Sequence, residues 1–231
     1  MTKKVKAREK AKVAQKAARK QVNPLLSLPK PHCASPGAGT VISGQRLNVM
    51  TAARLLSYTG ALAEENRQAL NQLAALLERI SPASYQHLQT PQATQSVGKH
   101  VRHILEHYQT LLDHLKASAC LDYEGRKRDT RLETCPQTAL QHLHAIDNAL
   151  TRVATLPADT ALTLGYPLDA NETHTTAALP SSLGRELAFL TSHSIHHMAL
   201  ISLLCAEQDI ALPEHFGVHP STLRHWQAQQ A

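Results

Sequence analysis

Aromatic residues are scarce in this sequence. Phe, Trp and Tyr make up 3% of the 231 residues, whereas apolar residues as a whole make up 42%. A core of ordinary size must therefore be built mainly from Leu, Ala, Ile and Val. Because Leu and Ala favour helices, and because aromatic residues are among those that strands prefer, this composition favours a helical domain over a β-sandwich.

Paired cysteines and long apolar runs are also missing. Cys33, Cys120, Cys135 and Cys205 show no C-x-x-C spacing, so we expect reduced thiols in a cytoplasmic protein and no disulfide framework. No apolar run approaches the roughly 20 residues that a membrane span needs. The amino terminus lacks the apolar segment of a secretory signal. We therefore expect no membrane partner.

Acidic residues are nearly absent from the first twenty residues, where Glu9 is the single acid among nine Lys or Arg. This stretch carries +8 while the whole chain carries +6, so the remainder sums to −2. The folded part is close to neutral and gives no general argument for nucleic-acid binding. Such binding is expected only through the tail 1–20; the alternatives are a membrane-attracting arm, a solubilising tail or an upstream extension before Met50.

Residues 1–49 are predicted to be a disordered basic tail and linker. Their second half is rich in residues that interrupt regular structure, namely Pro24, Pro29, Pro31, Pro36, Gly37, Gly39 and Gly44. Met50 directly precedes the first strong helical pattern. We therefore predict one domain over residues 50–231.

Four segments of this domain have apolar residues at helical intervals, over about 51–80, 96–118, 136–155 and from Ser181 or Ser182 to about 204. In the second and fourth segments the apolar steps alternate between four and three, and this heptad stripe includes Tyr108 and His197. The pattern predicts an all-α fold, a four-helix bundle of antiparallel type. A polar connection spans 120–135.

The remaining segments are predicted to be irregular. Residues 156–180 are expected to form a loop with a short hairpin that pairs 161–164 with 173–177. Residues 212–226 are expected to form an irregular carboxyl-terminal strap that closes with one helical turn.

Histidines are concentrated on two of the predicted helices. His193 and His197 are four residues apart, so a helix presents both on one face. The second helix carries a further stripe beside its apolar face. Two facing helices of this kind can assemble a three-nitrogen metal site that leaves positions open for water or substrate. The histidines of the stripe are His100, His103, His107 and His114.

Two segments resemble motifs of the DinB-like (DinB/YfiT) superfamily. Segment 96–108 (SVGKHVRHILEHY) resembles the motif of its second helix, and segment 191–201 (TSHSIHHMALI) resembles the H-x-x-x-H motif of its fourth helix. Segment 122–129 together with Glu133, and segment 216–222, resemble one bacterial branch. The resemblance implies a four-helix bundle that binds a divalent cation, Ni or Zn first and Fe or Mn as alternatives, through His103, His193 and His197. A helical wheel places His100 nearer the core face, so His100 is the second choice. His107, one turn beyond His103, is a further candidate or a partner that orients a ligand.

The resemblance also implies the kind of chemistry. Some superfamily members are thiol transferases, so we expect a metal-dependent transferase or hydrolase whose small-molecule substrate is a low-molecular-weight thiol or a similar compound. The alternative is a non-catalytic metal-binding or ligand-sensing bundle. A homodimer is a further expectation, because such bundles often pair through exposed helix faces.

The polar connection offers candidate substrate contacts. Arg126 and Arg128 can clamp an anionic substrate, since guanidinium groups match carboxylates; the alternative is an ion-pair network that pins the loop. Asp122 and Tyr123 are candidates for orienting a ligand histidine, with loop packing as the alternative.

Overall fold

The computed structural model describes residues 52–90, 94–117, 120–168 and 176–230. The predicted tail 1–49 and its boundary at Met50 lie outside these residues. The described part is mostly helical, with one two-stranded sheet. A mostly helical fold is therefore confirmed, and the small sheet, which the all-α class does not include, is formed by the expected hairpin.

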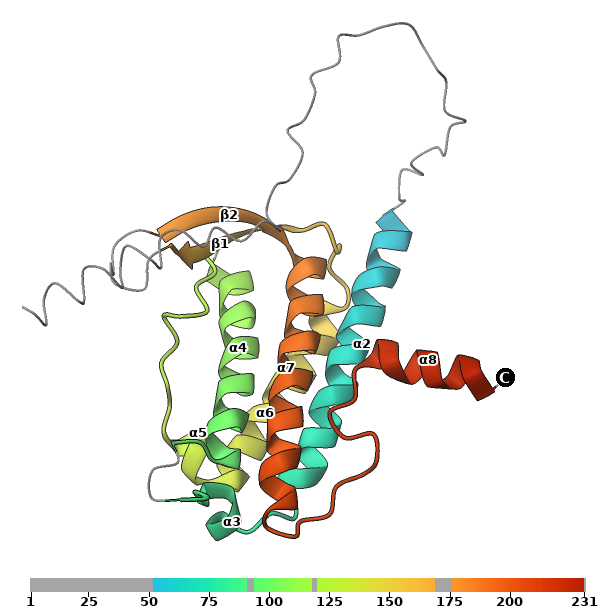
Figure 1. The fold of residues 1–231 in the computed structure, drawn as a ribbon. Coiled ribbons are helices and arrows are strands. Elements are labelled where there is room, and N and C mark those ends of the chain that lie inside the picture. Colours follow the sequence, from blue (N-terminus) through green and yellow to red (C-terminus); the bar gives the residue numbers. More distant parts are fainter. Residues whose placement is uncertain (1–51, 91–93, 118–119, 169–175, 231) are drawn as a thin grey trace, which may run out of the picture. The chain divides into compact units, whose positions relative to one another are not determined.

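The described residues contain four long helices that pack together: α2 (Ala52–Leu77), α4 (Val97–Ala117), α6 (Pro136–Val153) and α7 (Leu183–Ala206). α2 contacts α6 and α7, and α4 contacts the same two helices. Figure 1 shows that α2 and α7 run in one direction and α4 and α6 in the other, because the connection after α4 returns along the outside of the bundle. α4 and α7 are thus antiparallel neighbours, which brings the two histidine-bearing helices into contact.

Local sequence signals set where these helices begin. The Ser96 hydroxyl accepts a hydrogen bond from the Lys99 amide at 3.2 Å, and Ser182 accepts one from the Arg185 amide at 3.3 Å. Both are side-chain caps that satisfy an otherwise unpaired amide of the first turn. Pro136 is the first residue of α6, where its missing N–H costs nothing.

The heptad stripe of α4 lies in the core as predicted. Val97, Val101, Ile104, Tyr108 and Leu111 are all buried, and Leu115, the last residue of the predicted stripe, is half-buried. The stripe of α7 is buried as well, except at His197, which is half-buried. The heptad count placed His197 in the core, whereas the structure places it at the core's edge, among other imidazoles.

A buried chain of polar groups crosses the core between three helices. The Tyr108 hydroxyl donates to Asn66 Oδ1 at 2.6 Å and accepts from the Ser194 hydroxyl at 3.1 Å. The Asn66 amide donates to the carbonyl oxygens of Leu62, at 2.8 Å, and Leu187, at 3.0 Å. The chain therefore joins α2, α4 and α7 by hydrogen bonds as well as by apolar packing.

The hairpin consists of β1 (Ala161–Pro167) and β2 (Thr176–Ser182), paired antiparallel with Leu164 opposite Leu179. It is longer than predicted, and the second strand lies later in the chain than 173–177. Leu121 forms a parallel bridge to Leu164. The hairpin lies across the end of the bundle where α4 ends and α7 begins (Figure 1).

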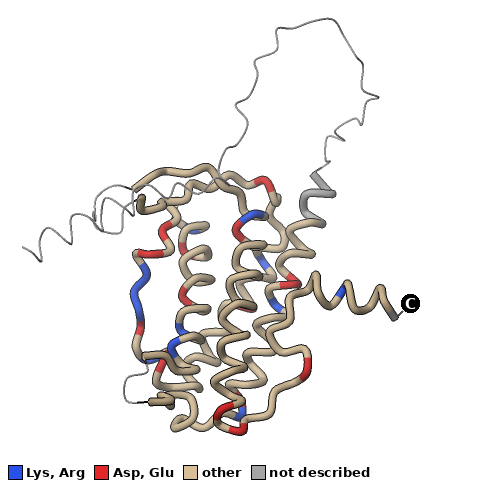
Figure 2. Tube along the Cα trace, in the orientation of Figure 1, with Lys and Arg blue, Asp and Glu red and all other residues tan. Residues whose placement is uncertain are grey.

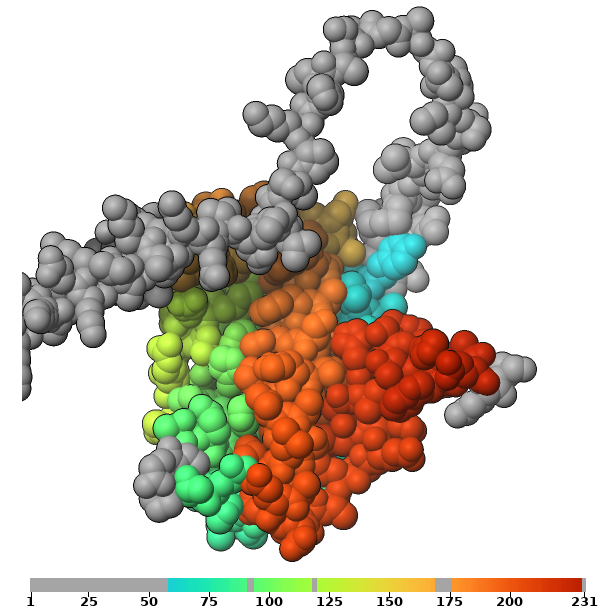
Figure 3. Space-filling view, viewed as in Figure 1, coloured from blue at the N-terminus to red at the C-terminus, as the bar shows by residue number. Residues whose placement is uncertain are grey.

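Short helices complete the described fold: α3 (Pro82–Gln86), α5 (Arg131–Thr134) and α8 (Pro220–Gln230). The prediction of one closing turn was wrong, since α8 has 11 residues. Figure 3 shows α8 beside α7 and α2 on the visible face. Before it, Gly217 has a φ of 69°, and a Cβ there would lie 3.1 Å from the Met198 carbonyl carbon. Only glycine fits this turn without strain.

Helix α7 passes a length-and-composition test for a membrane span, with 24 residues and a mean hydropathy of 1.3. This corrects the statement that no apolar segment is long enough. Core helices of globular bundles pass the same test, and the buried face of α7 packs on α2 and α4. The absence of a membrane partner stays a prediction.

Candidate metal centre

Five imidazoles meet between α4 and α7. The ring centroid of His103 lies 4.9 Å from that of His193 and 4.4 Å from that of His197. His107 lies 4.1 Å from His193, and His193 lies 4.6 Å from His197. His100 joins them through an Nδ1–Nδ1 distance of 3.0 Å to His197. All five candidate ligands from the sequence therefore belong to one cluster.

Three of these residues are spaced for a common ion. Ligand atoms of His103, His107 and His193 all lie within 4.8 Å of one another. The set derived from the sequence contains His103 and His193 but takes His197 as the third ligand, and that choice stays a prediction. His196 is exposed, as its position on the helix predicts.

The imidazoles of the cluster are neutral near pH 7. Burial lowers the pKa of His103 to about 2, with smaller contributions from the charges of His107 and other neighbours. Burial likewise lowers the pKa of His107 and of His193 to about 4, and that of His197 to about 3. A neutral imidazole keeps a lone pair, which is the form that binds a metal ion.

Hydrogen bonds decide which ring nitrogen is available. The His107 Nδ1 atom lies 2.7 Å from the carbonyl oxygen of His103, so Nδ1–H donates and Nε2 keeps the lone pair. The Nε2 atom of His193 is buried and has no hydrogen-bond partner. A buried polar atom without a partner costs about 1–3 kcal/mol. Both nitrogens fit the role of metal ligands.

Aromatic side chains close one side of the cluster. Tyr123 stacks on His107 with a centroid distance of 5.2 Å, and Phe189 stacks on His193 at 5.3 Å. The Tyr123 hydroxyl donates to Glu186, a fully buried carboxylate, at 2.9 Å. Tyr123 thus holds His107 in place. Asp122 accepts instead from the amides of Glu124 and Gly125 within its own turn.

A cavity of about 510 Å³ opens on the opposite side. It is lined by His100, His103 and His197 together with Thr94, Gln95, Lys99, Arg102 and Glu133. Glu133 forms an ion pair with Arg102 at 3.2 Å. A small molecule can therefore reach the imidazoles from this side. Glu133 belongs to the polar connection that resembles one branch of the superfamily, but no spacing in the sequence relates it to His103, because it comes from α5, thirty residues further along the chain.

The two candidate arginines differ in position. Arg126 is half-buried, and its Nη2 donates to His103 Nδ1 at 3.2 Å. Its Nε lies 3.6 Å from Glu106 Oε2 in an ion pair. Arg128 is exposed, within the run of positive charge along the connection in Figure 2. The substrate role of both arginines stays a prediction, but of the two Arg126 is the one bonded to the cluster.

The fold and the site define the class of protein: it is a helical bundle that carries a cluster of imidazoles between two of its helices. The comparison with known proteins gives the family. The chain belongs to the DinB superfamily, whose sequence model matches residues 45–201. The matched region contains all five clustered histidines.

One curated relative adds a second comparison. A Rhizopus delemar protein called "FK506-binding protein 5" is 35% identical over 109 residues, which cover 47% of this chain. The chain spans 28% of the length of that relative. No solved structure matches the chain.

Proposed function

We propose that this protein is a divalent-metal-binding member of the DinB superfamily that acts as a metal-dependent transferase or hydrolase on a small molecule. The carrying observation is the cluster of neutral imidazoles between α4 and α7, three of which have ligand atoms within 4.8 Å of one another. The proposal includes the four-helix bundle of the superfamily, a cytoplasmic location and a low-molecular-weight thiol as the favoured substrate.

His103 and His193 are the ligands common to both candidate sets. The third ligand is His197 if the family motif decides, and His107 if the distances between ligand atoms decide. The geometry favours His107, because its Nδ1–H bond to a backbone carbonyl leaves Nε2 free. Imidazole donors suit Ni and Zn better than Mg or Ca, and Fe or Mn remain alternatives.

The residues around the metal site and its cavity would attract the substrate and accept a proton. A bound divalent ion lowers the pKa of a coordinated water or thiol toward neutrality and so supplies a nucleophile. Lys99 and Arg102 give the adjoining cavity positive charge that attracts an anionic substrate. Glu133 lines the same cavity and is its carboxylate, which suits it to accept a proton. Glu106 is turned away from it, toward the Asp129 amide at 2.6 Å.

Metal analysis of single variants tests the ligand assignment. Purified wild-type protein should carry close to one divalent ion per chain, and His193→Ala should lose it. His196→Ala is the matched control, because this exposed neighbour on the same helix should leave the metal content unchanged. Full occupancy in His193→Ala, measured by elemental analysis, would remove the assignment.

The same measurement separates the two candidate third ligands. If His107 is a ligand, His107→Ala should lower metal affinity by about 10–100-fold or more, while His197→Ala should have a smaller effect. The reverse order supports His197. Equal retention of affinity in both variants would show that neither binds the ion.

A non-catalytic sensor or binding protein is the second candidate. The observation that favours it is that Glu133, the carboxylate of the cavity, is engaged by Arg102. The two functions differ in turnover: a catalyst consumes a thiol or ester probe in the presence of the ion, and a sensor binds the probe without changing it.

A further inference from the structure

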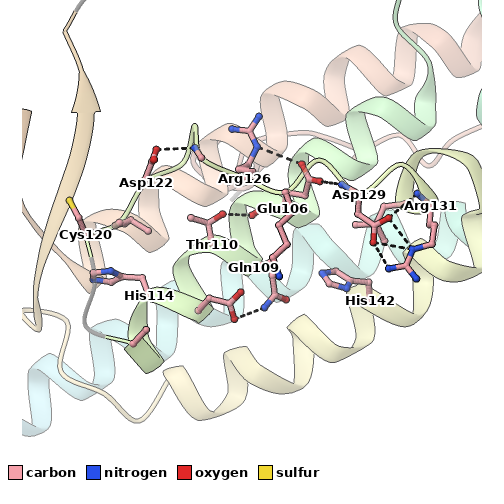
Figure 4. A pocket seen from close by; sticks show the side chains of 16 residues that line it. Glu106, Gln109, Thr110, His114, Cys120, Asp122, Arg126, Asp129, Arg131 and His142 are labelled. Atoms are coloured by element: carbon pink, nitrogen blue, oxygen red, sulfur yellow. Dashed lines mark hydrogen bonds and ion pairs between the residues drawn. The ribbon is translucent and has the colours of Figure 1, made fainter. Parts of the chain in front are cut away.

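A second and larger cavity lies on another side of α4. It has a volume of about 640 Å³ and is formed by α4, the connection after it and the start of α6. Its polar lining includes Glu106, Gln109, His114, Arg126 and His142 (Figure 4). None of the five clustered imidazoles lines it, so it is distinct from the cavity beside the metal centre. Cavities of this size accept an organic ligand.

Unsatisfied polar atoms gather around this cavity. Among the described residues, seven buried side-chain nitrogen or oxygen atoms have no hydrogen-bond partner, and four of them belong to its lining. They are Glu106 Oε2, His114 Nδ1, Arg126 Nε and His142 Nε2. Two of these atoms, Glu106 Oε2 and Arg126 Nε, face each other in an ion pair at 3.6 Å, beyond hydrogen-bond distance, whereas His114 Nδ1 and His142 Nε2 have no partner at all. Since a buried polar atom without a hydrogen bond is costly, a ligand that donates hydrogen bonds would satisfy the acceptors among these four atoms.

Glu106 is the deepest charged group of the cavity, with 7% of its surface exposed. Its Oε1 accepts from the Asp129 amide, and its Oε2 has only the ion pair with Arg126 Nε at 3.6 Å. The Nη groups of Arg126 bond elsewhere, to the Tyr123 carbonyl oxygen and to His103 Nδ1. Glu106 therefore retains a buried carboxylate oxygen that lacks a donor.

The surroundings of His142 are acidic. The charges of Asp129, Asp113 and Glu106 all act to raise its pKa, although burial has the larger effect and lowers it. His142 is therefore neutral near pH 7, and its Nε2 can accept a hydrogen bond. The Arg131 side chain is 79% exposed and is paired with Asp129, so its positive charge lies at the rim. Arg126 lies deeper and is paired with Glu106. The lining thus combines this buried ion pair with the imidazole of His142 and the carboxylates of Asp113, Asp122 and Asp129.

We propose that this cavity binds a small organic ammonium compound whose charged group lies between Glu106 and His142. Leu121, Leu132 and Ala117 line the same cavity and suit a short aliphatic body. An organic cation fits better than a bare metal ion. The described His, Cys, Asp and Glu residues contain one group close enough to share an ion, and that group is His103, His107 and His193.

The probe for this proposal is 1,4-diaminobutane, with 1,4-butanediol as a neutral compound of the same length. Binding to the full chain is measured by titration calorimetry, with and without a metal chelator, so that the result does not depend on the metal centre. The diamine should bind about tenfold or more tightly than the diol, because a charge-assisted bond to a buried carboxylate is stronger than a neutral one. Equal binding of the two, or none, overturns the proposal.

Matched variants locate the site. Glu106→Gln and His142→Leu should each weaken diamine binding by about tenfold. Glu124→Gln removes the same charge from an exposed position outside the cavity and should not. Circular dichroism confirms that each variant is folded. Since Glu106 adjoins a proposed metal ligand, His142→Leu on α6 is the second, independent test. Diamine binding that survives both substitutions refutes the site.

Discussion

Replacing one glycine with alanine should have opposite effects at two helical positions. An ideal Cβ at Gly98, in the first turn of α4, would lie 2.1 Å from the Glu133 carbonyl oxygen and 2.8 Å from the Tyr85 ring. A Cβ at Gly60, in α2, meets nothing within 4 Å. Alanine favours a helix over glycine by about 0.5–1 kcal/mol. Gly60→Ala should therefore stabilise the protein by about that amount.

Gly98→Ala gains the same helix propensity, but the new Cβ fits only if α5 moves away from α4. Overpacking of this kind costs about 1–3 kcal/mol, so Gly98→Ala should be less stable than Gly60→Ala by about 1–3 kcal/mol. Urea unfolding followed by circular dichroism measures both free energies from the shift in midpoint at constant slope. If Gly98→Ala is as stable as Gly60→Ala, the close approach of α4 to α5 is wrong. Because the obstructing atom belongs to Glu133, the substitution should also disturb the cavity beside His103.

Three further predictions concern pH, charge and a buried hydroxyl. The folded-state pKa values of about 2 for His103 and about 4 for His107 lie below the ordinary histidine value of 6.5, so the unfolded chain binds more protons. The melting temperature of metal-free protein should therefore be constant above about pH 6.5 and fall as the pH drops below it. A melting temperature that does not change from pH 7.5 to 5 would contradict buried neutral imidazoles. Arg126→Gln removes a cation 3.2 Å from His103 and should raise affinity for a divalent ion by roughly threefold to tenfold in a chelator competition assay; weaker binding would mean that Arg126 supports the site. Tyr85→Phe deletes a buried hydrogen bond of 2.5 Å to the Leu132 carbonyl oxygen and should cost about 1–3 kcal/mol in urea unfolding, whereas an unchanged midpoint would show that water replaces the hydroxyl.

The helices were predictable because their signals are local. The steps of four and three along α4 require one buried face, and Ser96 and Ser182 are recognisable caps. The hairpin was predicted too short, since no residue of its second strand is fully buried and its burial shows little alternation. The heptad count also placed His197 in the core, because periodicity identifies a face but does not show whether apolar or polar groups meet there.

The histidine cluster was predictable as a set but not in its details. Spacing shows that His193 and His197 share a face, and the family motif indicates a partner on the second helix. Which nitrogens are free depends on long-range contacts. Tyr123 and Arg126 reach the cluster from an irregular connection, and Glu133 reaches its cavity from α5; no sequence period relates these residues to the histidines.

The buried polar chain through Asn66, Tyr108 and Ser194 opposes any sliding of α7 along its axis and any rotation about it. A slide of one residue along the axis would translate α7 by about 1.5 Å, turn it by about 100° and carry Ser194 away from the Tyr108 hydroxyl. His193 directly precedes Ser194, so the same hydrogen bonds set the direction of its imidazole. The position of His193 along α7 is therefore fixed deep in the protein, whereas Tyr123 and Arg126 of the outer connection act on the imidazoles of α4.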